Sequence, residues 1–210
     1  YSIAIGDNAA NILQDDYTIA FGASAGYSGQ KYNSVAIGKN AGKWYQNYDS
    51  IAIGTNAGEG SNSSWQPQEK ECIAIGLNSG RYNQGLNTGY AIAVGSNSGV
   101  TNQGWYSVAI GNKSGETNQG SYNVAVGFQS GLTGQNSNSV ALGNSAGKTS
   151  QGSNSVSIGN LSGETSQGQY SISIGDQAGK GSQGTYSIAI GAASGQTSQN
   201  THSIAIGSNA

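Results

Sequence analysis

A five-residue unit that alternates large and small residues recurs along the whole chain, and it constrains the fold more than any other feature. It reads SIAIG at Ser2–Gly6 and again at Ser203–Gly207, with close variants such as SVALG at Ser139–Gly143. The unit occurs thirteen times, and ten of the twelve spacings between its final glycines are 16 residues, the others being 22 and 19. Such a constant period predicts a repeat architecture.

We number the repeat 1 to 16 from the first residue of the pentad. Position 2 is always Ile or Val, position 4 is always large and apolar, and position 3 is Ala except at Ser157 and Ser173. This alternation between glycines predicts a short β-strand, and no segment has the helical spacing of apolar residues. Because one strand per repeat cannot bury its apolar side alone, stacked copies are required. The predicted fold is all-β, a parallel β-solenoid of about thirteen 16-residue turns.

Position 13 is Gln in every complete repeat but the fourth, where Asn62 stands at that place. Stacked identical amides bond to one another along a stack of strands, so we expect a glutamine ladder from turn to turn. Sixteen residues also leave room for a second short strand near positions 8 to 12. Chain reversals are expected at the second glycine of each repeat and at Gln-Gly pairs.

We expect residues 1–210 to form a single tandem-repeat solenoid, cut from a longer array, since Tyr1 holds position 16 of a preceding repeat and Ala210 holds position 8. The two long repeats are adjacent, and they predict insertions that loop out within residues 59–71 and 85–90. If the fibre has one localised ligand site, the candidate residues are Trp65, Tyr82 and Tyr90.

Alternate residues of a strand face opposite sides. We expect the β-branched residues at positions 2 and 4 to form the core of each turn, and the small residues to face neighbouring chains. The expected contacts at an assembly axis are the residues at position 3, which are Ala4, Ala20, Ala36, Ala52, Ala74, Ala93, Ala109, Ala125, Ala141, Ser157, Ser173, Ala189 and Ala205.

Composition argues against several classes of function. The net charge is −2, so no basic surface indicates nucleic-acid binding. No apolar run approaches the roughly 20 residues of a membrane-spanning helix. The single histidine (His202) and single cysteine (Cys72) leave no set for a nucleophilic triad or a zinc site, and the acids are not paired as in a glycosidase. We predict no enzymatic activity, no metal and no cofactor, and we interpret Cys72 as structural.

Several polar columns face outward in this interpretation. Position 10 alternates in charge, which avoids repulsion between turns, in Lys43, Glu59, Arg81 and again in Lys148, Glu164, Lys180. A threonine column at position 11 keeps ice binding as an alternative function. A tyrosine column at position 16 leaves open both a carbohydrate platform and simple stacking. Sequons at Asn62, Asn112 and Asn160 permit N-glycosylation if the chain passes a eukaryotic secretory route.

The pentad S-[IV]-A-[IV]-G followed by x-x-[AS]-G resembles the YadA-like head repeats of trimeric autotransporter adhesins. Similar Gly-Ala-Ile repeats occur in fibre proteins of phages and large viruses. The resemblance spans the whole chain, although the period here is longer than is usual for those heads. It implies a left-handed β-roll, a homotrimer of identical chains, and a place outside the cell, on a cell surface or on a virion surface.

The predicted function is therefore that of a non-enzymatic structural fibre segment, an extracellular or virion-surface rod. Its partners are identical chains, in a homotrimer or fibre polymer. One alternative is an adhesin that binds a cell-surface glycan or a host receptor, which a glycan array would detect. The other alternative is an ice-binding protein, which a thermal hysteresis measurement would detect.

Overall fold

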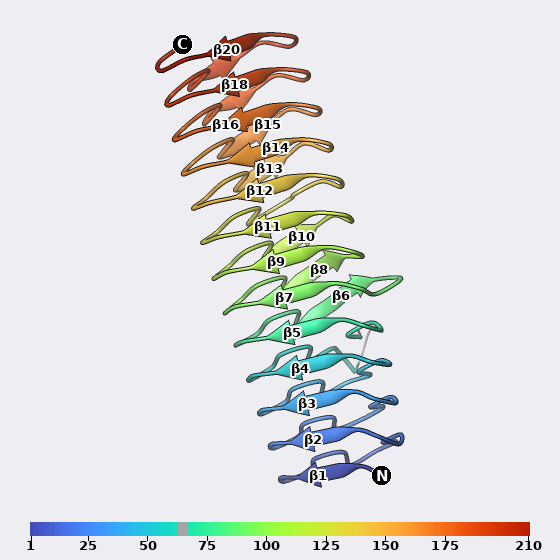
Figure 1. The fold of residues 1–210 in the computed structure, drawn as a ribbon. Coiled ribbons are helices and arrows are strands. Elements are labelled where there is room, and N and C mark those ends of the chain that lie inside the picture. Colours follow the sequence, from blue (N-terminus) through green and yellow to red (C-terminus); the bar gives the residue numbers. More distant parts are fainter. Residues whose placement is uncertain (63–66) are drawn as a thin grey trace. The chain divides into compact units, whose positions relative to one another are not determined.

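The computed structural model describes residues 1–62 and 67–210. The chain divides into two compact units, Tyr1–Ser107 and Val108–Ala210. Within the described residues each unit consists of short β-strands and turns, without a helix. In each unit the chain winds in successive turns that stack on one another (Figure 1). The predicted all-β parallel solenoid is thus confirmed.

The pentads form the main strands, and each pairs in parallel and in register with the pentad of the next turn. Val124 stands opposite Val140, and Ala125 stands opposite Ala141. In the first unit these strands are β1 (Ile3–Ile5), β2 (Ile19–Phe21), β3 (Val35–Ile37), β4 (Ile51–Ile53), β5 (Ile73–Ile75) and β7 (Ile92–Val94). In the second unit they are β9 (Val108–Ile110), β11 (Val124–Val126), β12 (Val140–Leu142), β14 (Val156–Ile158), β16 (Ile172–Ile174), β18 (Ile188–Ile190) and β20 (Ile204–Ile206).

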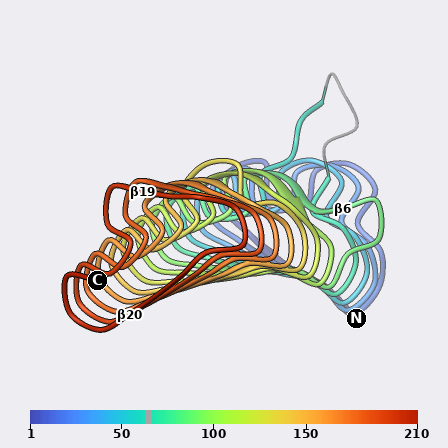
Figure 2. The ribbon, with the colours of Figure 1, turned by 90° about the horizontal axis from the view of Figure 1, so that it is seen from above.

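A second strand lies at positions 11 to 13, slightly later than predicted. Figure 2 shows this arrangement in the last turns, where β19 and β20 lie on opposite sides of the loop. The first unit contains β6 (Tyr82–Leu86) and β8 (Thr101–Gly104). The second contains β10 (Thr117–Gln119), β13 (Thr149–Gln151), β15 (Thr165–Gln167), β17 (Ser182–Gln183) and β19 (Ser198–Gln199). The later start follows from the glycine at position 9, which turns the chain before the strand begins.

Backbone geometry favours glycine at both of its regular places, although Ala10 holds position 9 of the first turn with φ +48°. Gly38, at position 5, has φ +125°, and a Cβ there would lie 2.7 Å from the carbonyl oxygen of Gly54 on the next turn. Gly42, at position 9, has φ +50°, and a Cβ there would lie 2.6 Å from Oε1 of Gln46. These glycines admit a left-handed turn and close contact between turns, which a larger residue would prevent.

The interior of each turn is lined by the small residues of the pentad, so the predicted facing is wrong. Ala109 is 0% exposed, whereas its neighbour Ile110 is 39% exposed. Residues at position 3 point into their own chain and cannot form contacts at an assembly axis. This correction applies to Ala20, Ala36, Ala52, Ala74, Ala93, Ala109, Ala125, Ala141, Ser157, Ser173 and Ala189, which are fully buried, while Ala4 and Ala205, in the end turns, are exposed and half-buried.

The glutamine at position 13 explains why a small residue faces inward. The Gln46 side chain is fully buried and lies across the interior. Its Nε2 donates to the backbone carbonyls of Val35 at 2.9 Å and Ser50 at 3.2 Å, and to Oε1 of Gln68 at 3.1 Å. Each glutamine therefore joins its own pentad to the next one. A β-branched residue at position 3 would compete with this amide for space.

The predicted glutamine ladder is confirmed in part: Gln68 Nε2 donates to Gln84 Oε1 at 3.0 Å and Gln119 Nε2 to Gln135 Oε1 at 3.1 Å. It is interrupted where Oε1 of Gln103, Gln119 and Gln151 receives no hydrogen bond from the described residues. Where Ser replaces Ala, its hydroxyl enters the ladder. Ser157 Oγ donates to Oε1 of Gln167 at 2.6 Å, and Ser173 Oγ donates to Oε1 of Gln183 at 2.5 Å. The two exceptions at position 3 therefore keep the interior hydrogen-bonded.

The two long repeats each keep a buried glutamine in the column but place their extra residues differently. Gln68, not Asn62, occupies the ladder in the fourth turn, and its Nε2 bonds the carbonyl of Cys72 four residues later, as in ordinary turns. The extra six residues therefore precede Gln68. In the next turn Gln84 bonds the carbonyl of Ala91, seven residues later, so three extra residues follow the glutamine.

This assignment predicts opposite results for two deletions of equal length. Removing residues 62–67 brings Gln68 to position 13 and restores a 16-residue turn, so the melting temperature should stay close to that of the parent. Removing residues 63–68 leaves Asn62 at position 13, with a shorter side chain that cannot reach the same carbonyls. Each buried group left unpaired costs about 1–3 kcal/mol. We expect the second variant to melt several degrees lower, and equal melting temperatures would contradict the assignment.

Candidate functional site

The side chains at positions 2 and 4 form an apolar stripe along the outer face of the pentad strands in each unit. We call these residues the apolar stripe. They lie at the surface because position 3, between them, faces inward. Away from the ends of the second unit, Val124 is 36% exposed and Leu142 is 41% exposed. Parallel strands are about 4.8 Å apart, so half-buried and exposed apolar side chains follow one another on successive turns. A continuous apolar surface of this kind marks an interaction site.

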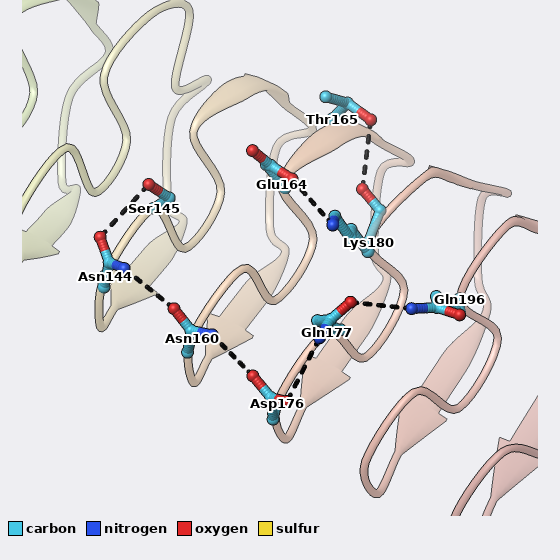
Figure 3. A network of polar contacts seen from close by, with 9 residues as sticks. All are labelled: Asn144, Ser145, Asn160, Glu164, Thr165, Asp176, Gln177, Lys180 and Gln196. Carbon is cyan, nitrogen blue, oxygen red and sulfur yellow. Dashed lines mark hydrogen bonds and ion pairs between the residues drawn. The ribbon is translucent and has the colours of Figure 1, made fainter.

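Polar side chains bond from turn to turn on other faces. In the second unit, Asn144 Nδ2 donates to Asn160 Oδ1 at 2.9 Å, and Asn160 Nδ2 donates to Asp176 Oδ1 at 2.7 Å (Figure 3). Lys180 Nζ lies 4.0 Å from Glu164 Oε2 in the charged column at position 10. In the first unit the same column pairs Arg81 with Glu59 at 2.6 Å. These two contacts agree with the alternation of charge read from the sequence.

The tyrosines at position 16 stack face to face on successive turns. Ring centroids are 4.7 Å apart between Tyr90 and Tyr106, and 5.0 Å apart between Tyr170 and Tyr186. His202 continues the second stack, at 5.1 Å from Tyr186. In these stacks the ring faces, on which a sugar would otherwise pack, are covered by neighbouring rings. The ring edges and hydroxyl groups remain accessible.

The candidate ligand residues contact different partners. Tyr82 lies in β6, where the guanidinium of Arg81 is 4.8 Å from its ring centroid. Tyr90 stacks on the ring of Tyr106 and lies 5.2 Å from Lys70 Nζ. Trp65 lies outside the described residues. A ligand site at these three residues stays a prediction.

Cys72 takes the place of a pentad serine and is buried. Burial raises the pKa of its thiol to about 12, so the reactive thiolate is scarce at neutral pH. Its Sγ accepts a hydrogen bond from the backbone N–H of Ala91 at 3.4 Å. Both features fit the structural role expected of this cysteine.

Other predicted sites are exposed but untested. Asn62, Asn112 and Asn160, the three sequon asparagines, lie at the surface. The threonine column continues through Thr117, Thr133 and Thr149, whose backbones bridge one another. Among residues 1–62 and 67–210, neither a cluster of three metal-ligating side chains nor a helix able to span a membrane is found.

The stripe is the surface feature that the sequence interpretation missed. The sequence did contain a pattern that could have revealed the stripe, because position 2 is always β-branched and position 4 is always large. The sequence alone does not show which side of a strand faces the interior.

A search of curated proteins and a search of solved structures gave no match. A family model does match: residues 182–210, which contain the last two pentads, match two copies of the YadA head domain repeat. The C-terminal part of the chain is thus similar to YadA head repeats, which confirms the resemblance read from the pentads.

Proposed function

We propose that the chain is a structural fibre segment on the surface of a cell or a virion, in which three identical chains cover one another's apolar stripes. The single observation that carries this proposal is the exposed stripe. The YadA head repeat at residues 182–210 supports it, because heads of that kind belong to surface fibres. The stripe now has the assembly role that the sequence interpretation gave to position 3.

The free energy available from covering the stripe is large enough for stable association. A side chain such as Ile110, 39% exposed, contributes about 1–2 kcal/mol when its remaining apolar surface is buried, at about 25 cal/mol per Å². The seven pentad strands of the second unit carry two side chains of the stripe each, of which six are at least 36% exposed and the others are half-buried. Their sum is roughly 15–25 kcal/mol, compared with an association cost of about 4–15 kcal/mol.

An identical chain fits the stripe better than an unrelated partner. A partner must present apolar groups at the same spacing of about 4.8 Å per level. A second copy does so at every turn, because its stripe has the same 16-residue period. Each turn presents two large apolar residues, so the same side-chain contact between two chains can be repeated at every turn of the stack.

The test is the mass of the native particle by sedimentation equilibrium. The chain has a mass of 21.2 kDa, and we expect a single species of three chains that persists on dilution to micromolar concentration. A folded species that stays at the mass of one chain at every concentration would contradict the proposal.

The exposed tyrosine columns favour a second candidate function, adhesion to a glycan. The edges and hydroxyls of Tyr170 and Tyr186 are accessible, and tyrosine hydroxyls are suited to hydrogen bonds with sugars. A glycan array probed with the native particle would decide the point. Selective binding that is lost in a double Tyr→Ala variant would support adhesion, and uniform background binding would exclude the glycans tested.

A further inference from the structure

The first four turns carry ionisable or amide side chains at position 14, where most later turns have glycine. They form a column of Asp15, Lys31, Asn47 and Glu69 on successive turns of the first unit. Backbone hydrogen bonds hold the levels together, since Lys31 N donates to Gln46 O at 2.9 Å and Asn47 N to Gln68 O at 3.0 Å. Lysine, asparagine and glutamate thus stand next to one another across neighbouring parallel segments.

Both ends of the Asn47 side-chain amide are held. Its Oδ1 accepts a hydrogen bond from the backbone N–H of Tyr48 at 2.9 Å, which polarises the carbonyl. Its Nδ2 donates to Oε2 of Glu69 at 3.3 Å. The carbonyl carbon is therefore made electrophilic by a donor on one side, and the amide nitrogen is placed beside a carboxyl group that can give it a proton.

Lys31 reaches the same space from the preceding turn. Lys31, Asn47 and Glu69 line one cavity of about 150 Å³, and among the described residues Gly29, Tyr45 and Pro67 also line it. The ammonium of Lys31 lies 3.5 Å from Oδ2 of Asp15, a loose ion pair on the side away from Asn47. Because Lys31 and Asn47 line the same cavity, a rotation of the flexible lysine side chain would bring Nζ toward the Asn47 carbonyl carbon.

We propose that Lys31 and Asn47 become joined by an isopeptide bond, with Glu69 as the residue that moves the protons. Nζ of Lys31, once deprotonated, attacks Cγ of Asn47 and forms the new C–N bond. The bond from Cγ to Nδ2 breaks, and Nδ2 leaves as ammonia. The overall change is from a lysine ammonium and an asparagine amide to a secondary amide and one ammonium ion, so no oxidant or cofactor is needed.

Glu69 is placed to act as acid and then as base. A protonated carboxyl gives its proton to the leaving Nδ2, and the carboxylate then takes a proton from the newly bonded Nζ. Burial raises the pKa of Glu69, against the opposing effects of the Asn47 hydrogen bond and the charge of Lys70. The environment thus favours the protonated form that the first step requires.

The consequence is a covalent tie between the second and third turns of the first unit. A solenoid whose turns are held only by hydrogen bonds can unfold one turn after another. A covalent bond between two neighbouring turns prevents these two turns from separating. Such a bond suits a fibre under mechanical load. The inference does not depend on how many chains assemble, because all of its atoms belong to one chain.

Mass spectrometry of the purified chain tests the proposal. The intact mass should be lower than the sequence mass by one ammonia. Because trypsin does not cleave after an acylated lysine, digestion should yield residues 1–39 joined to residues 44–70. The joined peptide separates this reaction from cyclisation of Asn47 onto its own backbone, which also releases ammonia but joins no second peptide.

Three variants complete the test. Lys31→Arg and Glu69→Gln should both have the full sequence mass and no joined peptide, with circular dichroism showing that they remain folded. Lys148→Arg, which changes a lysine on another turn, should keep the bond. A wild-type chain of full mass, cleaved normally after Lys31, would overturn the proposal. Bond formation at the parent level in Glu69→Gln would overturn the role of Glu69.

Discussion

Replacing Ala109, Ala125 and Ala141 together with lysine should prevent the chain from folding. These alanines lie on three successive turns of the second unit, and each is 0% exposed. A lysine there would place an ammonium group beside the glutamine ladder, without an acidic partner. An unpaired buried charge costs several kcal/mol, and the total stability of a domain is about 5–15 kcal/mol. Circular dichroism should show loss of the β signal and of a cooperative melting transition.

The matched control replaces the same three alanines with serine. Serine already occupies position 3 at residues 157 and 173, where its hydroxyl donates to a glutamine Oε1. The serine variant should therefore fold, with a melting temperature within a few degrees of the parent. If the lysine variant also folds and melts like the parent, position 3 does not face the interior.

Replacing Ile110, Val126 and Leu142 with lysine should have a different effect, since it should separate the chains without unfolding them. These residues belong to the apolar stripe of the same three turns, and Ile110 and Leu142 are about 40% exposed in the single chain. A lysine there stays solvated in a free chain but would be buried between chains, at a cost of several kcal/mol per charge. The native mass should fall to that of one chain, 21.2 kDa, with the β signal retained.

A control on the other side of the same turns adds the same charge. Thr117, Thr133 and Thr149 lie at position 11, away from the stripe. Their replacement with lysine should leave the native mass unchanged. Equal loss of assembly in the two variants would show that net charge, and not the stripe, controls association. Unchanged assembly in the stripe variant would show that the stripe is not the interface.

The register of the solenoid was predictable because the period of the sequence sets it directly. A constant 16-residue spacing brings equivalent residues together on successive turns, and Val124 does stand opposite Val140. The glutamine ladder was predictable for the same reason. Asn62 was misassigned because a repeat with six extra residues has two possible places for them, and only the contacts of Gln68 show which place is used.

The facing of the pentad was not predictable from alternation alone. Alternation shows that Ile172 and Ile174 share one side and that Ser173 faces the other, but it does not show which side is interior. The usual expectation places large apolar residues inside. Here the glutamine side chain already fills the turn, and its amide requires a small neighbour. The 16-residue period does bring Lys31 and Asn47 together, but the place of Glu69 beside them depends on where the six extra residues lie, which the contacts of Gln68 show.

The accessibility of a thiol placed on the stripe tests the central claim most directly. In a Cys72→Ser background, Ile110→Cys and Thr149→Cys each introduce one thiol at a site that the single chain leaves at least partly exposed. If identical chains cover the stripe, a maleimide should label the thiol at position 110 at least tenfold more slowly than the thiol at position 149 in the native particle. The two rates should be equal in denaturant. Equal rates in the native particle would show that the stripe is open to solvent and that the assembly proposed here is wrong.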